Sequence, residues 1–244
     1  MSYITQTNYP GVFHLEHFIF LAIVILLIAL GLFLNFKVVK QDKTRELILK
    51  ISGIVLLMMI IANRFSIVLV NRIVFENKSY SWINLIPNTF CGFTSLFLGL
   101  TIVIGKKDNP FLNACYPVAF IGGLLSTIYP DYLDHQMFFD PRTITGLIHH
   151  AIDIWIVIYA LAIKYINPSF KKLPYFFLYI TSTMTFGVFL MDALGFSSAM
   201  QINKPLISSL PIFTSWYMVG FMLTCLYVGF LFLYPIIMKK LKKA

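Results

Sequence analysis

One apolar segment of the sequence carries three residues that can exchange protons or bind a metal ion. His149, His150 and Asp153 lie inside the apolar run at about 143–166. Asp153 is four residues after His149 and three after His150, so the three side chains share a face if the run is helical. Burying these groups in a membrane costs several kcal/mol unless they pair or face a wet cavity. The cluster is therefore a candidate functional site.

A second apolar segment, at about 84–105, supplies candidate nucleophiles. Cys91 carries a thiol, and the nearby Thr89 carries an alternative hydroxyl. A histidine at matching depth would accept the thiol proton, and the thiolate would then attack a carbonyl carbon. Asp153 would orient the imidazole or stabilise its charged form. The residues thus predict acyl transfer or ester hydrolysis.

Three further ionisable residues are expected near the same level. Arg64 lies in the outer half of the second apolar segment, Asp131 follows the fourth, and Asp192 lies close to the outer end of the sixth. A guanidinium inside a membrane requires a partner. Asp131, Asp153 and Asp192 are the carboxylates that could pair with Arg64, and we predict these residues to support the site.

The elements that must position these residues are long and apolar. The chain has 244 residues, of which 59% are hydrophobic and 12% charged, whereas about 25% of the residues of a soluble domain are charged. Seven apolar runs are long enough to cross a hydrocarbon core of about 30 Å. They lie at 17–36, 47–72, 84–105, 111–130, 143–166, 174–194 and 213–238. We predict an all-α membrane protein, a single transmembrane domain over residues 1–244 with one bundle of seven helices.

The basic residues predict the orientation of the bundle. Of the 19 Lys and Arg residues, 14 fall in alternate loops or at the C-terminus. By the positive-inside rule, these parts face the cytoplasm and the N-terminus lies outside. The basic residues flank apolar runs, where they contact anionic headgroups. We therefore expect membrane phospholipids as partners and no nucleic acid; protein partners stay unknown.

The orientation also predicts the depth of the candidate site. With a rise of 1.5 Å per residue, Cys91 lies about 10 Å below the outer surface, and His149 and His150 lie about 9–11 Å below it. Glycerol ester bonds of phospholipids lie just below the headgroups. The expected substrate is thus an acyl ester of a lipid in the outer leaflet.

Zinc binding is the rival use of the histidines and carboxylates. His150 and Asp153 supply two ligands at i+3, and Asp131 or Asp192 could supply a third, but the sequence has no H-E-x-x-H motif. It also has no phosphate-binding G-x-x-x-x-G-K-[ST] loop, and its last apolar run has no central lysine for a Schiff base. We therefore expect no metal and no cofactor.

Several stretches form an ordered pattern along the chain. They are IPNTFCGF at 86–93, LLSTIYPD at 124–131, ITGLIHHAIDIW at 144–155, FLMDALGFSSAMQINKP at 189–205 and the pair Trp216-Tyr217. This pattern, which covers residues 12–235, resembles the YwaF-type family of bacterial integral membrane proteins. Distant eukaryotic relatives of that family include a transmembrane acyltransferase of ether phospholipids and the androgen-induced hydrolases of fatty-acid esters.

The resemblance implies specific roles for matching residues. It implies Cys91 as the catalytic nucleophile and a base that best matches His150, with His149 beside it. The hydrolase branch uses threonine as the nucleophile, which keeps Thr89 as an alternative. The chain departs from the family in having Asn88 where members carry histidine, and GFSSAM where they carry a G-x-N-Y-M-like run. The resemblance also implies the plasma membrane of a bacterium, crossed several times.

Two other classes of function remain open from the sequence. The polar residues on the outer side could form the binding site of a small-solute transporter or of a membrane subunit of a transport complex. The chain could also be a non-catalytic assembly protein of the membrane, in which case every polar position named above would tolerate substitution.

Overall fold

The computed structural model describes residues 12–130, 133, 136–203 and 216–241, and this part of the chain contains seven α-helices and no β-strand. The helices are α1 (Leu15–Lys37), α2 (Asp42–Leu69), α3 (Phe90–Ile104), α4 (Pro110–Ile128), α5 (Pro141–Ala162), α6 (Leu173–Asp192) and α7 (Trp216–Leu241). A π-helical turn (Val70–Val74) extends α2, and short 3-10 helices precede α3 (Trp82–Leu85) and α6 (Phe170–Lys172). The predicted all-α class is confirmed.

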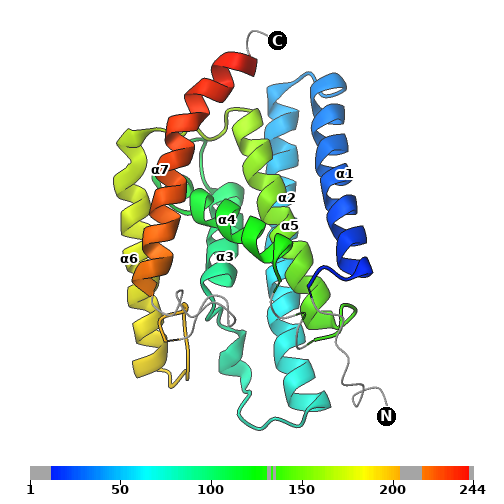
Figure 1. The fold of residues 1–244 in the computed structure, drawn as a ribbon, viewed down its shortest axis with the longest axis vertical. Coiled ribbons are helices and arrows are strands. Elements are labelled where there is room, and N and C mark those ends of the chain that lie inside the picture. The colour runs from blue at the N-terminus through cyan, green and yellow to red at the C-terminus, as the bar shows by residue number, and fades with distance from the viewer. Residues whose placement is uncertain (1–11, 131–132, 134–135, 204–215, 242–244) are drawn as a thin grey trace.

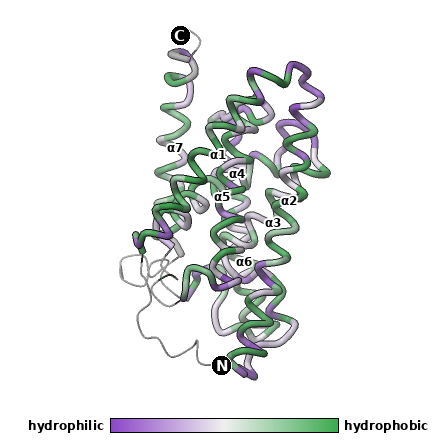
Figure 2. The backbone as a smooth tube through the Cα atoms, turned by 90° about the vertical axis from the view of Figure 1, so that its right-hand side faces the viewer, coloured by the Kyte–Doolittle hydropathy of each residue, from purple (hydrophilic) through white to green (hydrophobic). Residues whose placement is uncertain are grey.

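The surface of the bundle is apolar, as a lipid environment requires. Six of the described helices are long and apolar enough to cross a membrane, and α3 is a shorter apolar helix. Large side chains such as Ile25 and Leu26 of α1 are 68% and 65% exposed, whereas Asn35, His149 and Asp153 are buried. Figure 2 shows hydrophobic residues along most of the helical tube, with hydrophilic residues gathered largely at its ends. The chain is a multi-pass membrane protein.

Helices α2, α3, α4 and α5 pack together and form the centre of the bundle. Helix α4 crosses this centre obliquely, while α1 packs on α5, and α6 and α7 pack on α4 (Figure 1). Gly123 allows α4 to approach α5 closely, since a Cβ atom there would lie 3.1 Å from the carbonyl oxygen of His150. The start of α1 lies well below the end of α7 along the long axis of the bundle (Figure 1). Which end faces the cytoplasm stays a prediction.

The start of the third helix differs from the prediction. Helix α3 begins at Phe90 rather than near Asn84. Pro87 disfavours helical backbone at the residue before it, and Ile86 is accordingly extended. Thr89 then caps the helix, because its hydroxyl oxygen accepts a hydrogen bond from the N–H of Gly92 at 3.2 Å. Cys91 consequently lies in the first turn of α3, and the depth expected from a longer helix does not apply to it.

Candidate functional site

The position of Cys91 at the start of α3 has an electrostatic consequence. The first N–H groups of a helix lack partners within the helix and create a partial positive charge there. The sulfur of Cys91 lies 3.9 Å from the hydroxyl oxygen of Ser126 on α4. Gly122, one turn earlier on α4, leaves room for this sulfur, since a Cβ atom there would lie 3.4 Å from it.

Arg64 of α2 holds the non-helical segment that leads to Cys91. Its Nη2 donates hydrogen bonds to the carbonyl oxygen of Asn84, to that of Ile86 at 3.0 Å and to Oδ1 of Asn88 at 3.1 Å. Non-helical backbone at membrane depth requires such partners, and Arg64 supplies them. Within the described residues Arg64 forms no ion pair, so the possible pairing with Asp153 or Asp192 is not formed.

The segment that follows α6 holds the same turn from the other side. The N–H of Met200 donates to the carbonyl oxygen of Asn88 at 2.7 Å, and Oε1 of Gln201 accepts from the N–H of Phe90 at 3.1 Å. Met200 and Gln201 have positive φ angles of 49° and 53°, a backbone conformation that few residues other than glycine adopt. The GFSSAM stretch therefore helps to position the start of α3.

The histidine and aspartate cluster of α5 is buried, and the three side chains share one face as predicted. The His149 and His150 rings have centroids 3.9 Å apart. Nδ1 of His149 lies 3.1 Å from the carbonyl oxygen of Thr145, which can only accept, so Nδ1 carries the proton and Nε2 a lone pair. Nδ1 of His150 lies 3.7 Å from Oδ2 of Asp153, which is longer than a hydrogen bond.

Ser95 connects α3 to this cluster. Its hydroxyl lies 2.6 Å from Oδ2 of Asp153 and 2.9 Å from the carbonyl oxygen of Cys91. The hydroxyl has one proton, which it shares between these two acceptors. Ser95 thus ties the carboxylate of α5 to the turn of α3 that carries the candidate nucleophile.

A cavity of about 330 Å³ joins these elements. Its lining includes Arg64, Thr89, Cys91, His149 and His150, which are five of the eight predicted site residues. Asp153 is buried and contacts Ser95, but it is not part of the lining.

One predicted supporting carboxylate is not brought to this cavity, and another lies outside the described residues. Asp192 is exposed at the end of α6 and does not line the cavity. Asp131 lies outside the described residues.

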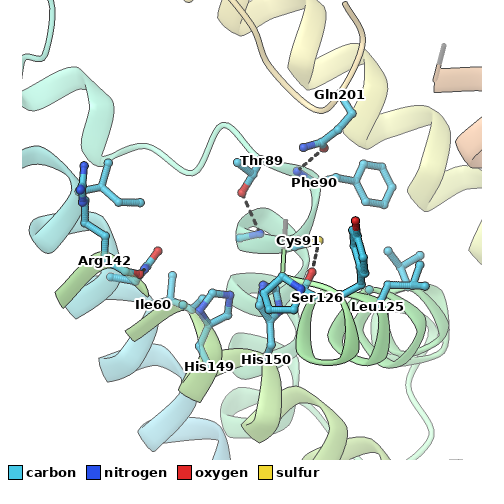
Figure 3. A pocket seen from close by; sticks show the side chains of 18 of the residues that line it. Ile60, Thr89, Phe90, Cys91, Leu125, Ser126, Arg142, His149, His150 and Gln201 are labelled. Atoms are coloured by element: carbon cyan, nitrogen blue, oxygen red, sulfur yellow. Dashed lines mark hydrogen bonds between the residues drawn. The ribbon is translucent and has the colours of Figure 1, made fainter. Parts of the chain in front are cut away.

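The cavity has a polar side and an apolar side. The polar side is lined by Asn63, Arg64, Gln136, Arg142 and His149, and the apolar side by Val118, Leu125, Val219, Met222 and Leu223 of α4 and α7. Figure 3 shows Arg142 and Leu125 on opposite sides, with Cys91 between them and Ser126, His149 and His150 around it. Such a cavity suits an amphipathic molecule better than a purely polar solute.

Several residues of the site escaped sequence reasoning. Ser126 and Gln201 line the cavity, and Ser95 contacts Asp153. Ser95 is four residues after Cys91, so its place on the same helical face was a usable signal. Gln201 reaches the cavity through a turn with positive φ angles, and no local pattern predicts that arrangement.

The fold and this cavity define the class of the protein: a multi-pass α-helical membrane protein with a buried amphipathic site between its central helices. The chain belongs to the TMEM164 family, whose model matches residues 12–234. No curated protein and no solved structure matches the sequence significantly. The narrower resemblance to YwaF-type proteins stays a prediction.

Proposed function

We propose that the protein is a membrane-embedded acyltransferase or esterase that acts on lipid acyl esters through Cys91 and His150. The observation that carries the proposal is the shared cavity: a thiol at a helix N-terminus and a buried histidine pair line the same amphipathic space. The polar side would receive the headgroup and glycerol backbone of a lipid. The apolar side, formed by α4 and α7, would receive the start of an acyl chain.

The first step forms an acyl-enzyme. Nε2 of His150 takes the proton of the Cys91 thiol, and the sulfur attacks the ester carbonyl carbon. The C–O bond to glycerol then breaks, and the leaving alkoxide takes the proton back from the imidazolium of His150. This step yields a thioester on Cys91 and a lysolipid.

The second step releases the acyl group. A hydroxyl group of an acceptor lysolipid, or water, loses its proton to His150 and attacks the thioester carbonyl carbon. The C–S bond breaks, and the proton returns to the Cys91 sulfur. An acceptor lipid gives acyl transfer, and water gives hydrolysis.

Asp153 is positioned to orient the imidazole ring of His150. Its Oδ2 lies 3.7 Å from Nδ1 of His150, and catalytic hydrogen bonds commonly shorten when substrate binds. A closer approach would fix the tautomer in which Nε2 accepts a proton. Ser95 holds the carboxylate in place from α3.

Trapping of the acyl-enzyme tests the proposal. Purified protein in nanodiscs would be incubated with phospholipid, and intact-protein mass spectrometry would detect an added acyl group that hydroxylamine removes. We expect the adduct in wild type and in Cys225→Ser, because Cys225 is exposed on α7 and does not line the cavity. We expect none in Cys91→Ala and a large loss in His150→Gln. Equal adduct levels in Cys91→Ala and wild type would overturn the proposal and favour a transport or assembly role.

The leaflet that supplies the substrate follows from the proposed orientation. We propose, from the lysine distribution, that the N-terminus lies outside and that the cavity serves the outer leaflet. In a chain without native cysteines, single cysteines at Lys78→Cys and Lys107→Cys would be treated with a membrane-impermeant maleimide on intact cells. Labelling of Lys78→Cys alone agrees with this orientation, and labelling of Lys107→Cys alone reverses it.

A further inference from the structure

The cluster on α5 brings together buried nitrogen and oxygen atoms of three side chains. Nε2 of His149, Nδ1 of His150 and Oδ1 of Asp153 are buried and have no hydrogen-bond partner within the described structure. Donor atoms of these three residues lie within 4.8 Å of one another. Leaving buried polar atoms unpaired costs about 1–3 kcal/mol each, so the arrangement calls for a species that accepts electron pairs.

Two other polar atoms of the cluster already have hydrogen-bond partners outside it. Nδ1 of His149 donates to the carbonyl oxygen of Thr145 at 3.1 Å, and Oδ2 of Asp153 accepts from Ser95 at 2.6 Å. Histidines that bind metals usually donate their other ring N–H to a carbonyl or carboxylate, and carboxylates that bind metals are likewise hydrogen-bonded. The contacts around the cluster thus match the surroundings of metal ligands.

We propose that His149, His150 and Asp153 bind a divalent transition-metal ion. Two imidazole nitrogens and one carboxylate oxygen suit Zn²⁺ and its neighbours in the first transition row. Tetrahedral ligands of zinc lie roughly 3.3 Å apart. Side-chain rotations that draw the three donor atoms together complete the set, and the cavity supplies a fourth position. This inference replaces the expectation from the sequence that the protein binds no metal.

The charge balance favours an anionic fourth ligand. Asp153 neutralises one of the two metal charges, and Arg64, which lines the same cavity, adds another positive charge nearby. A hydroxide ion from the cavity offsets part of this excess.

The metal site also regulates the proposed catalysis, a consequence that rests on the proposed function. A metal bound to Nδ1 of His150 leaves the proton of the neutral ring on Nε2. Nε2 then donates and cannot accept the proton of Cys91. The metal-bound protein is therefore unable to form the acyl-enzyme, and a chelator restores the reaction.

Metal binding by the purified protein tests the site. The protein would carry a tag without histidines, be loaded with Zn²⁺, be dialysed and be analysed by plasma mass spectrometry. We expect one zinc per chain in wild type and in His17→Gln, because His17 is buried but bonded to the carbonyl oxygen of Thr127 at 2.9 Å. We expect at least a tenfold loss of affinity in His149→Gln and Asp153→Asn. Unchanged zinc in both variants, or none in folded wild type, overturns the proposal.

A second measurement does not depend on the folding of variants. Wild type loaded with Co²⁺ should show the intense visible absorption of a tetrahedral ion, and weak octahedral bands would contradict the site. Acyl-enzyme formation is measured separately on metal-free protein. Zinc binding without any adduct means that the proposed function fails and the site stands. Adduct formation without zinc binding means that the metal site fails and the proposed function stands.

Discussion

Two polar groupings of this protein differ in their burial and in how their atoms are partnered. The loop network joins the α3–α4 loop to the α5–α6 loop through Asp108. Its carboxylate accepts from Nζ of Lys172 at 2.5 Å, from Nδ2 of Asn113 at 3.0 Å and from the N–H of Asn167 at 3.1 Å. The cluster on α5 instead leaves an atom of each member unpartnered in the described structure.

Under the proposed function, the difference separates a structural role from a functional one. A carboxylate with several donors strengthens the contact between two loops, and these donors use most of its capacity to accept hydrogen bonds. A buried cluster with unpartnered atoms weakens the fold, and selection keeps such a cluster where it binds or reacts. Substitutions in the loop network should therefore change the free energy of unfolding, and substitutions in the cluster on α5 should change the rate of acyl-enzyme formation.

Asp153→Asn should give a large loss of activity, though smaller than the complete loss expected of Cys91→Ala. The amide loses the charge that stabilises the His150 imidazolium, so the rate of acyl-enzyme formation should fall roughly 10²-fold. The free energy of unfolding of the variant should differ little from that of wild type, because Oδ1 of the replaced carboxylate has no hydrogen-bond partner in the described structure. Mass spectrometry of the adduct and thermal unfolding in detergent measure the two effects. A rate within twofold of wild type would show that Asp153 does not orient the base.

Ser95→Ala should give a smaller loss at the same site. The variant removes the hydroxyl that lies 2.6 Å from Asp153 and 2.9 Å from the carbonyl oxygen of Cys91. The carboxylate then loses its position relative to His150, and we expect roughly a tenfold slower adduct formation. Thr94→Val serves as the control, because Thr94 is buried one residue earlier but bonds Phe90 and Tyr179. Equal losses in both variants would point to a general packing defect.

Much of the fold follows from the sequence, because long apolar runs and their charged boundaries are determined locally. The grouping of His149, His150 and Asp153 followed from helical spacing alone. The start of α3 could not be predicted in this way. The apolar run continues through Pro87 and Thr89, but Pro87 disfavours helix before it and Thr89 caps the helix that follows. The sequence allows an ion pair for Arg64, but Arg64 donates hydrogen bonds to the carbonyl oxygens of Asn84 and Ile86. Such neutral partners come from a non-helical turn whose path depends on tertiary contacts.

Asp108→Asn should lower the stability of the fold and leave activity unchanged, the opposite of what we expect for Asp153→Asn. The variant loses the ion pair with Lys172, and we expect a loss of about 1 kcal/mol in the free energy of unfolding because the pair is partly solvated. Adduct formation should be unchanged, since Asp108 does not line the cavity. Asp42→Asn is the matched control: Asp42 pairs with Arg45 at 3.4 Å but its side chain is 90% exposed. Equal stability of the two variants would remove the loop network as a stabilising contact.

The pH dependence of stability gives the smallest and most specific effect. Burial raises the pKa of Asp108, but hydrogen bonds from Lys172, Asn113 and the N–H of Asn167 outweigh it, so the pKa is lowered overall. A carboxyl whose pKa is lower in the folded state stabilises the fold above its unfolded pKa of about 3.9, and this contribution disappears as the pH falls through the folded value. The stability difference between wild type and Asp108→Asn should thus be full at neutral pH and shrink in acid. Thermal unfolding of both proteins from neutral to acidic pH measures it. A stability difference that grows in acid would mean that the loop network binds a protonated Asp108. The contrast with the cluster on α5 would then not come from a fully partnered carboxylate.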